Sequence, residues 1–131
     1  MKNDIIHFLI DTDILIEHLY HENKKTNSDL EIAMMNGICF TTVINAAELY
    51  FAAHNADEKE SIDNLLKALK VLGLNSRYSL NISKFFNKVA TVRDALICSV
   101  AEFNNLIIFT NNINRYEKTN IKIIQPTKLR E

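Results

Sequence analysis

Three acidic residues of the chain, Asp11, Glu48 and Asp94, lie where an apolar segment ends or begins. A carboxylate in such a place costs free energy unless it is paired with a cation or binds a metal ion. Asn112 closely follows the apolar run of residues 106–109 and adds an amide oxygen. Carboxylate and amide oxygens are the ligands that hard divalent cations prefer. These residue types predict a site for Mg²⁺ or Mn²⁺, provided that the fold brings them together.

Each acid also has an ordinary structural explanation. Asp11 can cap the helix that follows it, and Glu48 lies three residues after Asn45, as in a capping box. Asp94 can stand in the first turn of a capped helix or pair with a neighbouring arginine. Asp13 lies two residues after Asp11, and two carboxylates so close repel one another unless a cation or a helix dipole compensates. The local sequence leaves both explanations open.

Apolar periodicity predicts strands that alternate with helices along the chain. The strands are expected at residues 5–10, 38–44, 106–110 and 121–124, with a weaker one at 73–80. The helices are expected at residues 14–21, 28–36, 45–54, 57–72 and 82–105, with the last broken near Thr91. Ser28 and Asn45 are expected to cap the second and third helices, and Gly37 to end the second.

Near-continuous apolar strands separated by helices are typical of a parallel sheet covered on both faces. The sequence thus predicts an α/β fold with a central, mostly parallel sheet of four or five strands flanked by helices. Ligands of such sheets bind beyond the carboxyl ends of the strands. The acids follow strands or open helices, so we expect them at one rim of the molecule.

Length and composition limit the classes of protein to which the chain can belong. Its 131 residues, 47% of them hydrophobic, predict one folded domain over residues 1–131 rather than a disordered chain. No apolar run approaches the ~20 residues of a membrane span, and Asp4 and His7 interrupt any secretory signal. Cys39 and Cys98 lie in apolar stretches and are expected to be buried thiols of a cytoplasmic protein. The net charge of −1 means that a polyanionic substrate would need a cation held locally.

Four segments occur in a characteristic order. FLIDTDILIE opens the chain, FTTVINAAELYFAA follows, and RDALICSVAEFNNLIIFTNNINRYEK precedes a final apolar run at residues 121–126. The first is similar to a strand ending in D-T-x-x-L-I, and the second to a strand and a helix carrying x-x-E-L. The third is similar to a D-x-x-I-A-A helix, an apolar strand and a T-x-N-x-x-D-F segment. Together they resemble the PIN-domain nucleases, most closely the VapC-type toxins of bacterial toxin–antitoxin pairs.

The resemblance implies roles for individual residues. It makes Asp11, Glu48 and Asp94 the catalytic acids and, with Asn112, the metal ligands. Supporting polar residues would be Thr12, Asp13 and Thr110, and candidates to guide an RNA backbone are Lys84, Lys88, Arg93 and Arg115. Two positions depart from the pattern, because Arg115 stands where the family usually has Asp and Tyr116 where it has Phe.

The implied function is that of a Mg²⁺- or Mn²⁺-dependent endoribonuclease, the toxin of a type II toxin–antitoxin pair. A metal-activated water would hydrolyse phosphodiester bonds of tRNA or rRNA. The resemblance also implies a homodimer and a cognate antitoxin that inserts into the site. The alternative is a catalytically weak PIN domain that binds RNA or a protein without cutting, and Arg115 is the residue that keeps this alternative open.

Overall fold

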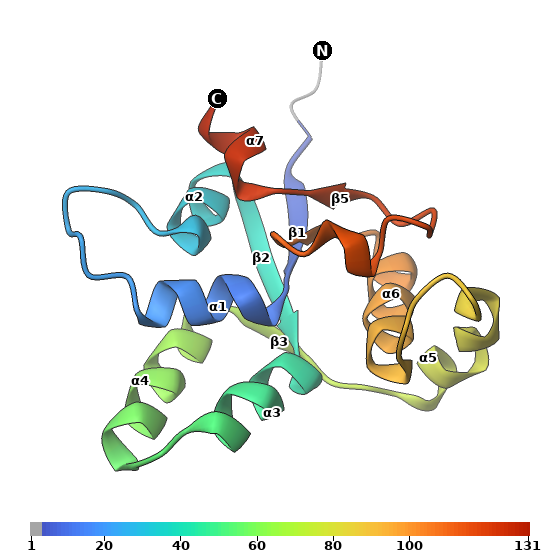
Figure 1. Ribbon diagram of the computed structural model, residues 1–131, viewed down its shortest axis with the longest axis horizontal. Helices are drawn as coiled ribbons and strands as arrows, with labels where there is room; N and C mark the ends of the chain where they lie inside the picture. Colours follow the sequence, from blue (N-terminus) through green and yellow to red (C-terminus); the bar gives the residue numbers. More distant parts are fainter. Residues whose placement is uncertain (1–3) are drawn as a thin grey trace.

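The computed structural model describes residues 4–131 and has a five-stranded sheet at its centre (Figure 1). The strands lie in the order β3-β2-β1-β4-β5, and every neighbouring pair is parallel. Their bounds are β1 Ile6–Ile10, β2 Gly37–Thr42, β3 Lys70–Leu72, β4 Ile107–Phe109 and β5 Ile123–Ile124. The predicted α/β fold with a parallel central sheet is confirmed.

Helices cover both faces of the sheet, as Figure 1 shows. One face carries α1 Thr12–Leu19, α2 Asp29–Asn36, α3 Val43–Ala52 and α4 Ala56–Lys67. The other carries α5 Ser76–Leu80, the 3-10 helix η1 Ile82–Phe85 and α6 Val92–Asn104. A second 3-10 helix, η2 Ile113–Arg115, follows β4, and α7 Pro126–Arg130 packs against α2. Over residues 4–131, no helix combines the length and apolar character that crossing a bilayer requires.

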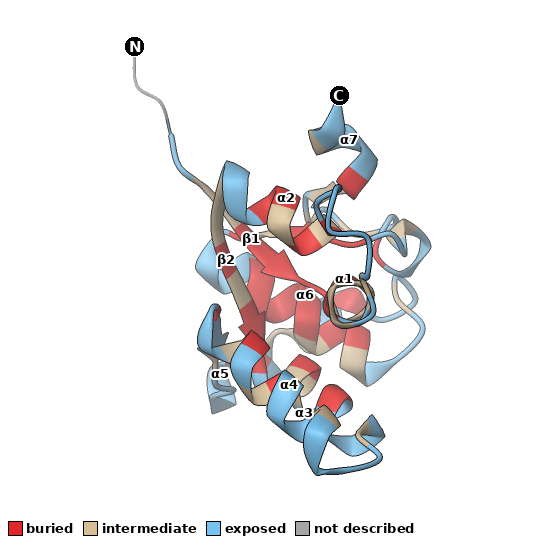
Figure 2. Cartoon of the chain, turned by 90° about the vertical axis from the view of Figure 1, so that its left-hand side faces the viewer, coloured by how far each residue is buried: buried red, intermediate tan, exposed pale blue. Residues whose placement is uncertain are grey.

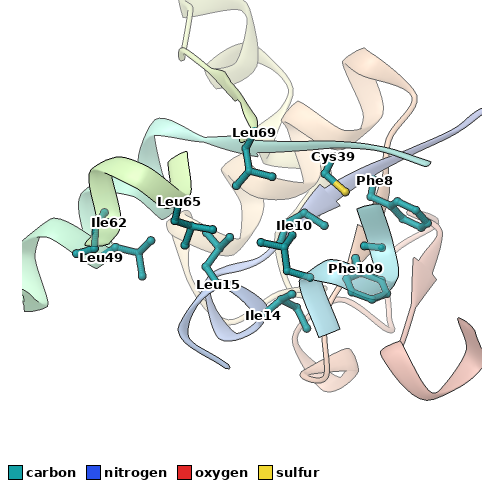
Figure 3. Packing of buried hydrophobic residues seen from close by; sticks show 12 residues of the cluster. Phe8, Ile10, Ile14, Leu15, Cys39, Leu49, Ile62, Leu65, Leu69 and Phe109 are labelled. Atoms are coloured by element: carbon teal, nitrogen blue, oxygen red, sulfur yellow. The ribbon is translucent and has the colours of Figure 1, made fainter. Parts of the chain in front are cut away.

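The two faces of the sheet bury two separate hydrophobic cores. Alternation along β1 sends Phe8 and Ile10 into the first core and Leu9 into the second. Figure 3 shows Phe8 and Ile10 among the side chains of the first core, and Figure 2 shows the buried sheet enclosed by helices whose outer faces are exposed. Cys39 and Cys98 are buried free thiols, one in each core, as expected from the sequence. Burial raises the pKa of both thiols to about 12.

Local capping signals set several boundaries correctly. Ser28 forms a capping box with Glu31 at the start of α2. Thr91 caps α6, so the predicted break near this residue is confirmed. Gly37 is the C-cap of α2, and its extended backbone (φ 177°) lets the chain pass directly into β2.

Three expectations about secondary structure were wrong. Asn45 does not cap the third helix: the Thr42 hydroxyl does, and Asn45 closes the capping box from the third helical position. The fourth helix, predicted to reach residue 72, ends at Lys67. The strand predicted at 73–80 lies instead at 70–72, where two of the three residues are exposed and the sequence therefore shows no apolar strand pattern. Within 73–80 the chain forms α5 after its N-cap Asn75. The C-terminal helix α7 was not predicted.

Alanine at Gly37 is expected to destabilise the protein by about 2 kcal/mol or more, as overpacked positions do. A Cβ atom there would lie 2.2 Å from the carbonyl oxygen of Ile6, so β1 and β2 would have to separate where they pair. Gly73→Ala is the matched control, because nothing lies within 4 Å of its added Cβ. Urea denaturation of both variants tests this, and equal stabilities would contradict it.

Candidate active site

Asp11 lies at the carboxyl end of β1 and is the N-cap of α1. Its side chain is only 2% exposed. The Oδ1 atom accepts hydrogen bonds from the Thr12 backbone N–H at 2.9 Å and from Asn45 Nδ2 at 3.1 Å. The Oδ2 atom accepts one from the Tyr116 hydroxyl at 2.7 Å. The carboxylate is therefore fixed in orientation by its neighbour Thr12 and by two residues distant in sequence, Asn45 and Tyr116.

Glu48 and Asp94 come to the same rim from two other helices. Glu48 lies in the second turn of α3, because that helix begins at Val43, and its side chain is 40% exposed. It accepts a hydrogen bond from the Thr12 hydroxyl. Asp94 lies in the first turn of α6, and its side chain is almost fully buried. We call Asp11, Glu48 and Asp94 the acidic triad.

The guanidinium of Arg93 contacts every member of the acidic triad. Nη2 donates to Asp11 Oδ1 at 2.8 Å and to Glu48 Oε1 at 2.9 Å, and Nε donates to Glu48 Oε2 at 3.1 Å. Nη1 donates to Asp94 Oδ1 at 3.1 Å. Partial burial lowers the pKa of Arg93, but the hydrogen bonds to Glu48 and the charge of Asp11 outweigh it, and the pKa is raised overall. The site therefore contains its own permanent cation.

The charge of Arg93 also acts on Glu48. Partial burial raises the pKa of this carboxyl. The hydrogen bonds from Arg93 and Thr12 and the charge of Arg93 lower it by a larger amount, so that the pKa lies below its ordinary value. Glu48 is thus ionised at neutral pH.

Tyr116 is fully buried directly beneath this cluster. Its hydroxyl accepts a hydrogen bond from Arg93 Nη1 at 2.7 Å and donates one to Asp11 Oδ2. Burial and the charge of Asp11 raise the pKa of Tyr116, which keeps the hydroxyl protonated and able to donate. A phenylalanine at this position would make neither hydrogen bond.

Asp13 belongs to a neighbouring cluster rather than to the acidic triad. It accepts hydrogen bonds from the Thr110 hydroxyl at 2.9 Å and from the Asn111 backbone N–H at 2.8 Å, which tie α1 to the loop after β4. Burial raises the pKa of Asp13, and these hydrogen bonds act in the opposite direction. Asn112 is exposed, and its backbone N–H donates to the Thr110 hydroxyl.

The four basic candidates for RNA binding divide into three situations. Lys84 forms an ion pair with Glu102 at 2.5 Å, away from the acids. Arg93 is part of the acid cluster. Lys88 and Arg115 line a cleft of about 430 Å³ beside Asp94, together with Lys118, which the sequence did not single out.

The acidic triad has the oxygen donors that Mg²⁺ and Mn²⁺ prefer, so the residue types fit such an ion. In residues 4–131, however, no three His, Cys, Asp or Glu side chains are grouped closely enough to hold one. Arg93 lies among the three acids and contacts each of them. The oxygen donors for a metal ion are therefore in place, but in this structure the cation bound to them is the guanidinium of Arg93.

Sequence reasoning identified the three acids but not the residues that hold them. The sequence predicts Asn45 as a helix cap, yet its amide donates to Asp11 and to the Thr12 hydroxyl, the latter at 2.9 Å. The sequence makes Arg93 a candidate to guide RNA and indicates at most a pairing with Asp94, whereas its guanidinium also reaches Asp11 and Glu48. The available signal was that two polar residues, Arg115 and Tyr116, replace the usual residues of one motif.

Comparisons with known proteins agree with this architecture. The sequence model of the PIN domain family matches residues 8–121. One similar solved structure is that of VapBC2 from Rickettsia felis, bound to a DNA fragment from the VapBC2 promoter. The matched chain is 18% identical with a TM-score of 0.76, and the match covers 92% of this chain and 98% of that one.

Two further solved structures have the same fold. VapBC-1 from nontypeable Haemophilus influenzae is similar at 21% identity (TM-score 0.74, covering 93% of this chain and 99% of that one). PAE2754 from Pyrobaculum aerophilum is similar at 19% identity (TM-score 0.66, 95% and 86%). No curated protein matches the chain. With a family match over most of its length and the fold and acids described above, the chain belongs to the PIN domain family.

Proposed function

We propose that this protein is a Mg²⁺- or Mn²⁺-dependent endoribonuclease, the toxin of a type II toxin–antitoxin pair in the cytoplasm. The observation that carries the proposal is the convergence of the acidic triad. Its members come from sequence positions 11, 48 and 94 and meet at the carboxyl-end rim of a parallel sheet, two of them almost fully buried. Buried acids gathered in this way need a cation, and PIN-domain proteins use such acids for nucleic-acid hydrolysis.

The residues of the site divide the work among them. The acidic triad would hold a divalent ion, with Asn112 as a further oxygen donor, and that ion would supply an activated water and charge neutralisation at the scissile phosphate. Asn45 and Tyr116 fix the orientation of Asp11 through their hydrogen bonds. The Asp13–Thr110 pair holds the loop that carries Asn112 next to the rim.

The cleft beside Asp94 is the proposed path of the RNA backbone. Lys88, Arg115 and Lys118 place three cations there, next to the acids. Because phosphate contacts carry most of the salt-dependent affinity for nucleic acid, a local cleft of this kind serves a protein whose net charge is −1.

Replacing Lys88 and Lys118 together by glutamine is expected to weaken RNA binding by about 10-fold or more and to reduce the salt slope of log K by roughly 1 to 2. Lys84→Gln is the control, since Lys84 is already paired with Glu102. Fluorescence anisotropy with a labelled RNA at several salt concentrations measures both quantities. An equal effect of the control would show that only general surface charge matters.

An antitoxin is the proposed protein partner. A groove of about 280 Å³ lies between α1, α3 and α4, and its largely apolar lining includes Ile16, Leu19 and Leu49 together with Glu48 of the acidic triad. A chain seated there would contact one member of the acidic triad, Glu48. The similar solved structures include VapBC complexes and a toxin–antitoxin complex from Klebsiella pneumoniae, which supports this kind of partner. We further propose that the toxin is a homodimer.

Removal of divalent metal is expected to abolish RNA cleavage. Purified protein free of any partner should cut total RNA into discrete fragments with Mn²⁺ or Mg²⁺, lose this activity in EDTA, and regain it when excess Mn²⁺ is returned. Cleavage that persists in EDTA would contradict the metal dependence. If no divalent ion supports cleavage by folded protein, the enzyme assignment fails.

The alternative, a PIN domain that binds RNA or a protein without cutting, is favoured by one specific observation. Arg115 stands at the position where the family motif usually has Asp, and its Nη1 atom contacts Asp94 Oδ1 at 3.3 Å. This adds a second cation to the acids. Binding of RNA without cleavage in the experiment above would establish this function instead.

A further inference from the structure

The acidic triad already contacts a cation of the same protein, the guanidinium of Arg93. Arg93 uses all three of its guanidinium nitrogens on these acids, and it binds Glu48 in bidentate fashion through Nε and Nη2. Bidentate, charge-assisted contacts of this kind are the strongest that an arginine makes. The Arg93 side chain is 19% exposed and those of Asp11 and Asp94 are almost fully buried, so these two ion pairs are only weakly screened, while the pair with the half-exposed Glu48 is screened more.

A divalent ion bound by the same carboxylates would compete with this guanidinium. Asp11 Oδ1 is a shared acceptor, since it receives Arg93 Nη2 together with the Thr12 N–H and Asn45 Nδ2. Both oxygens of Glu48 are also taken by Arg93. Two cations cannot use these oxygens at full strength at the same time, because each would repel the other across a few ångströms.

We propose that Arg93 is an internal counter-ion of the acidic triad that a divalent metal ion must displace. This inference rests on the metal dependence in the proposed function. It makes Arg93 a positioning residue: in the metal-free protein it holds the three acids together, and it sets the metal concentration at which the site loads. Arg93 lies in the first turn of α6, next to the partly exposed edge of the site, so its side chain has a route outward.

The first test is Mn²⁺ binding by isothermal titration calorimetry to the whole purified protein. Arg93→Gln is expected to bind Mn²⁺ on the order of 10-fold more tightly than the wild type, the usual size of a coupling between two sites. Arg130→Gln is the matched control, because it removes an ion pair of similar length with Asp29 that involves no member of the triad. Unchanged or weaker binding by folded Arg93→Gln would overturn the proposal.

A second measurement uses the wild-type protein and therefore does not depend on whether a variant folds. In the wild-type protein, the Nε–Hε resonance of Arg93 is expected to shift and to exchange faster with water as Mg²⁺ is added, because the guanidinium leaves Glu48. A resonance that stays unchanged when Mg²⁺ saturates the site would overturn displacement.

The two proposals fail in different ways. If Mn²⁺ binds equally to wild type and Arg93→Gln and RNA is cleaved, the counter-ion proposal is wrong and the nuclease stands. If Mn²⁺ binds more tightly to the variant but neither protein cuts RNA, displacement is supported and the nuclease assignment is wrong. If neither protein binds Mn²⁺, both are overturned.

Discussion

Asp11→Asn is expected to reduce metal-dependent RNA cleavage by more than roughly 100-fold, because loss of a direct metal ligand should exceed the 10- to 100-fold cost of losing an outer-shell partner. Asparagine offers one neutral oxygen where aspartate offers two charged ones. The site would then hold a divalent ion with two carboxylates instead of three, and the charge available to bind the ion and orient its water falls accordingly.

The same substitution should leave the protein folded. Three of the donors to Asp11 converge on Oδ1, and an asparagine oxygen can take that position and accept from Thr12, Asn45 and Arg93. Only the Oδ2 position is changed: the NH₂ group of asparagine takes it and faces the Tyr116 hydroxyl. Arg93 keeps Glu48 and Asp94 as charged partners, so the cost is about 1 kcal/mol, the typical net value of one hydrogen bond. Loss of activity in this variant therefore reports on chemistry rather than on unfolding.

Single-turnover cleavage of a defined RNA with saturating Mn²⁺ measures the effect. Asp63→Asn serves as the control, because Asp63 lies on α4 and pairs with Tyr50 and Lys59 outside the site. The control should cut at the wild-type rate. If Asp11→Asn cuts the same bonds as fast as the wild type, the acids at this rim are structural and the cleavage has another origin.

The convergence of the acids could be predicted from the sequence because it depends on topology. Apolar runs marked β1, β2 and β4, and parallel strands end at a common rim. An acid placed just after a strand or at the start of a helix must then lie near that rim. The motif order added the identity of the family.

The arrangement inside the site could not be predicted, because it depends on which way long side chains turn. Arg93 and Asp94 are neighbours in sequence, and no periodicity indicates that the guanidinium of Arg93 reaches across to Asp11 and Glu48. The hydroxyl of Tyr116 gains its role only because the ring is buried under the same acids.

The errors in the fold have a similar origin. Strand β3 has three residues at the edge of the sheet, beginning with an exposed lysine, and its pairing with β2 rather than its side chains defines it as a strand. Thr42 and Asn45 are both good capping residues, and local sequence does not decide which of them begins α3.

Arg93→Ala is expected to lower the free energy of unfolding by about 3 kcal/mol when EDTA is present, as is typical when one partner of a buried ion pair is removed. Two of the acids left behind, Asp11 and Asp94, are almost completely buried. Arg115 compensates only weakly, since it is half-exposed and contacts only Asp94 of the triad, at 3.3 Å.

Divalent metal should reverse most of this loss. Ligand binding stabilises the folded state by mass action, and the loss of a competitor gives the variant a larger gain from Mn²⁺ than the wild type receives. Urea denaturation with EDTA and with millimolar Mn²⁺ measures both effects. Arg130→Ala, which removes a partly exposed ion pair with Asp29, should cost about 1 kcal/mol in either buffer.

The comparison separates two explanations of why an arginine stands among three acids. If Arg93 stabilises the protein only by packing its side chain at the start of α6, Arg93→Ala loses the same free energy of unfolding in both buffers, because a metal ion cannot replace packing. If Arg93 acts as a counter-ion of the acidic triad, Mn²⁺ replaces its positive charge and the stability difference between variant and wild type shrinks. The contacts of Arg93, which are polar and directed at carboxylates and hydroxyls, favour the second result.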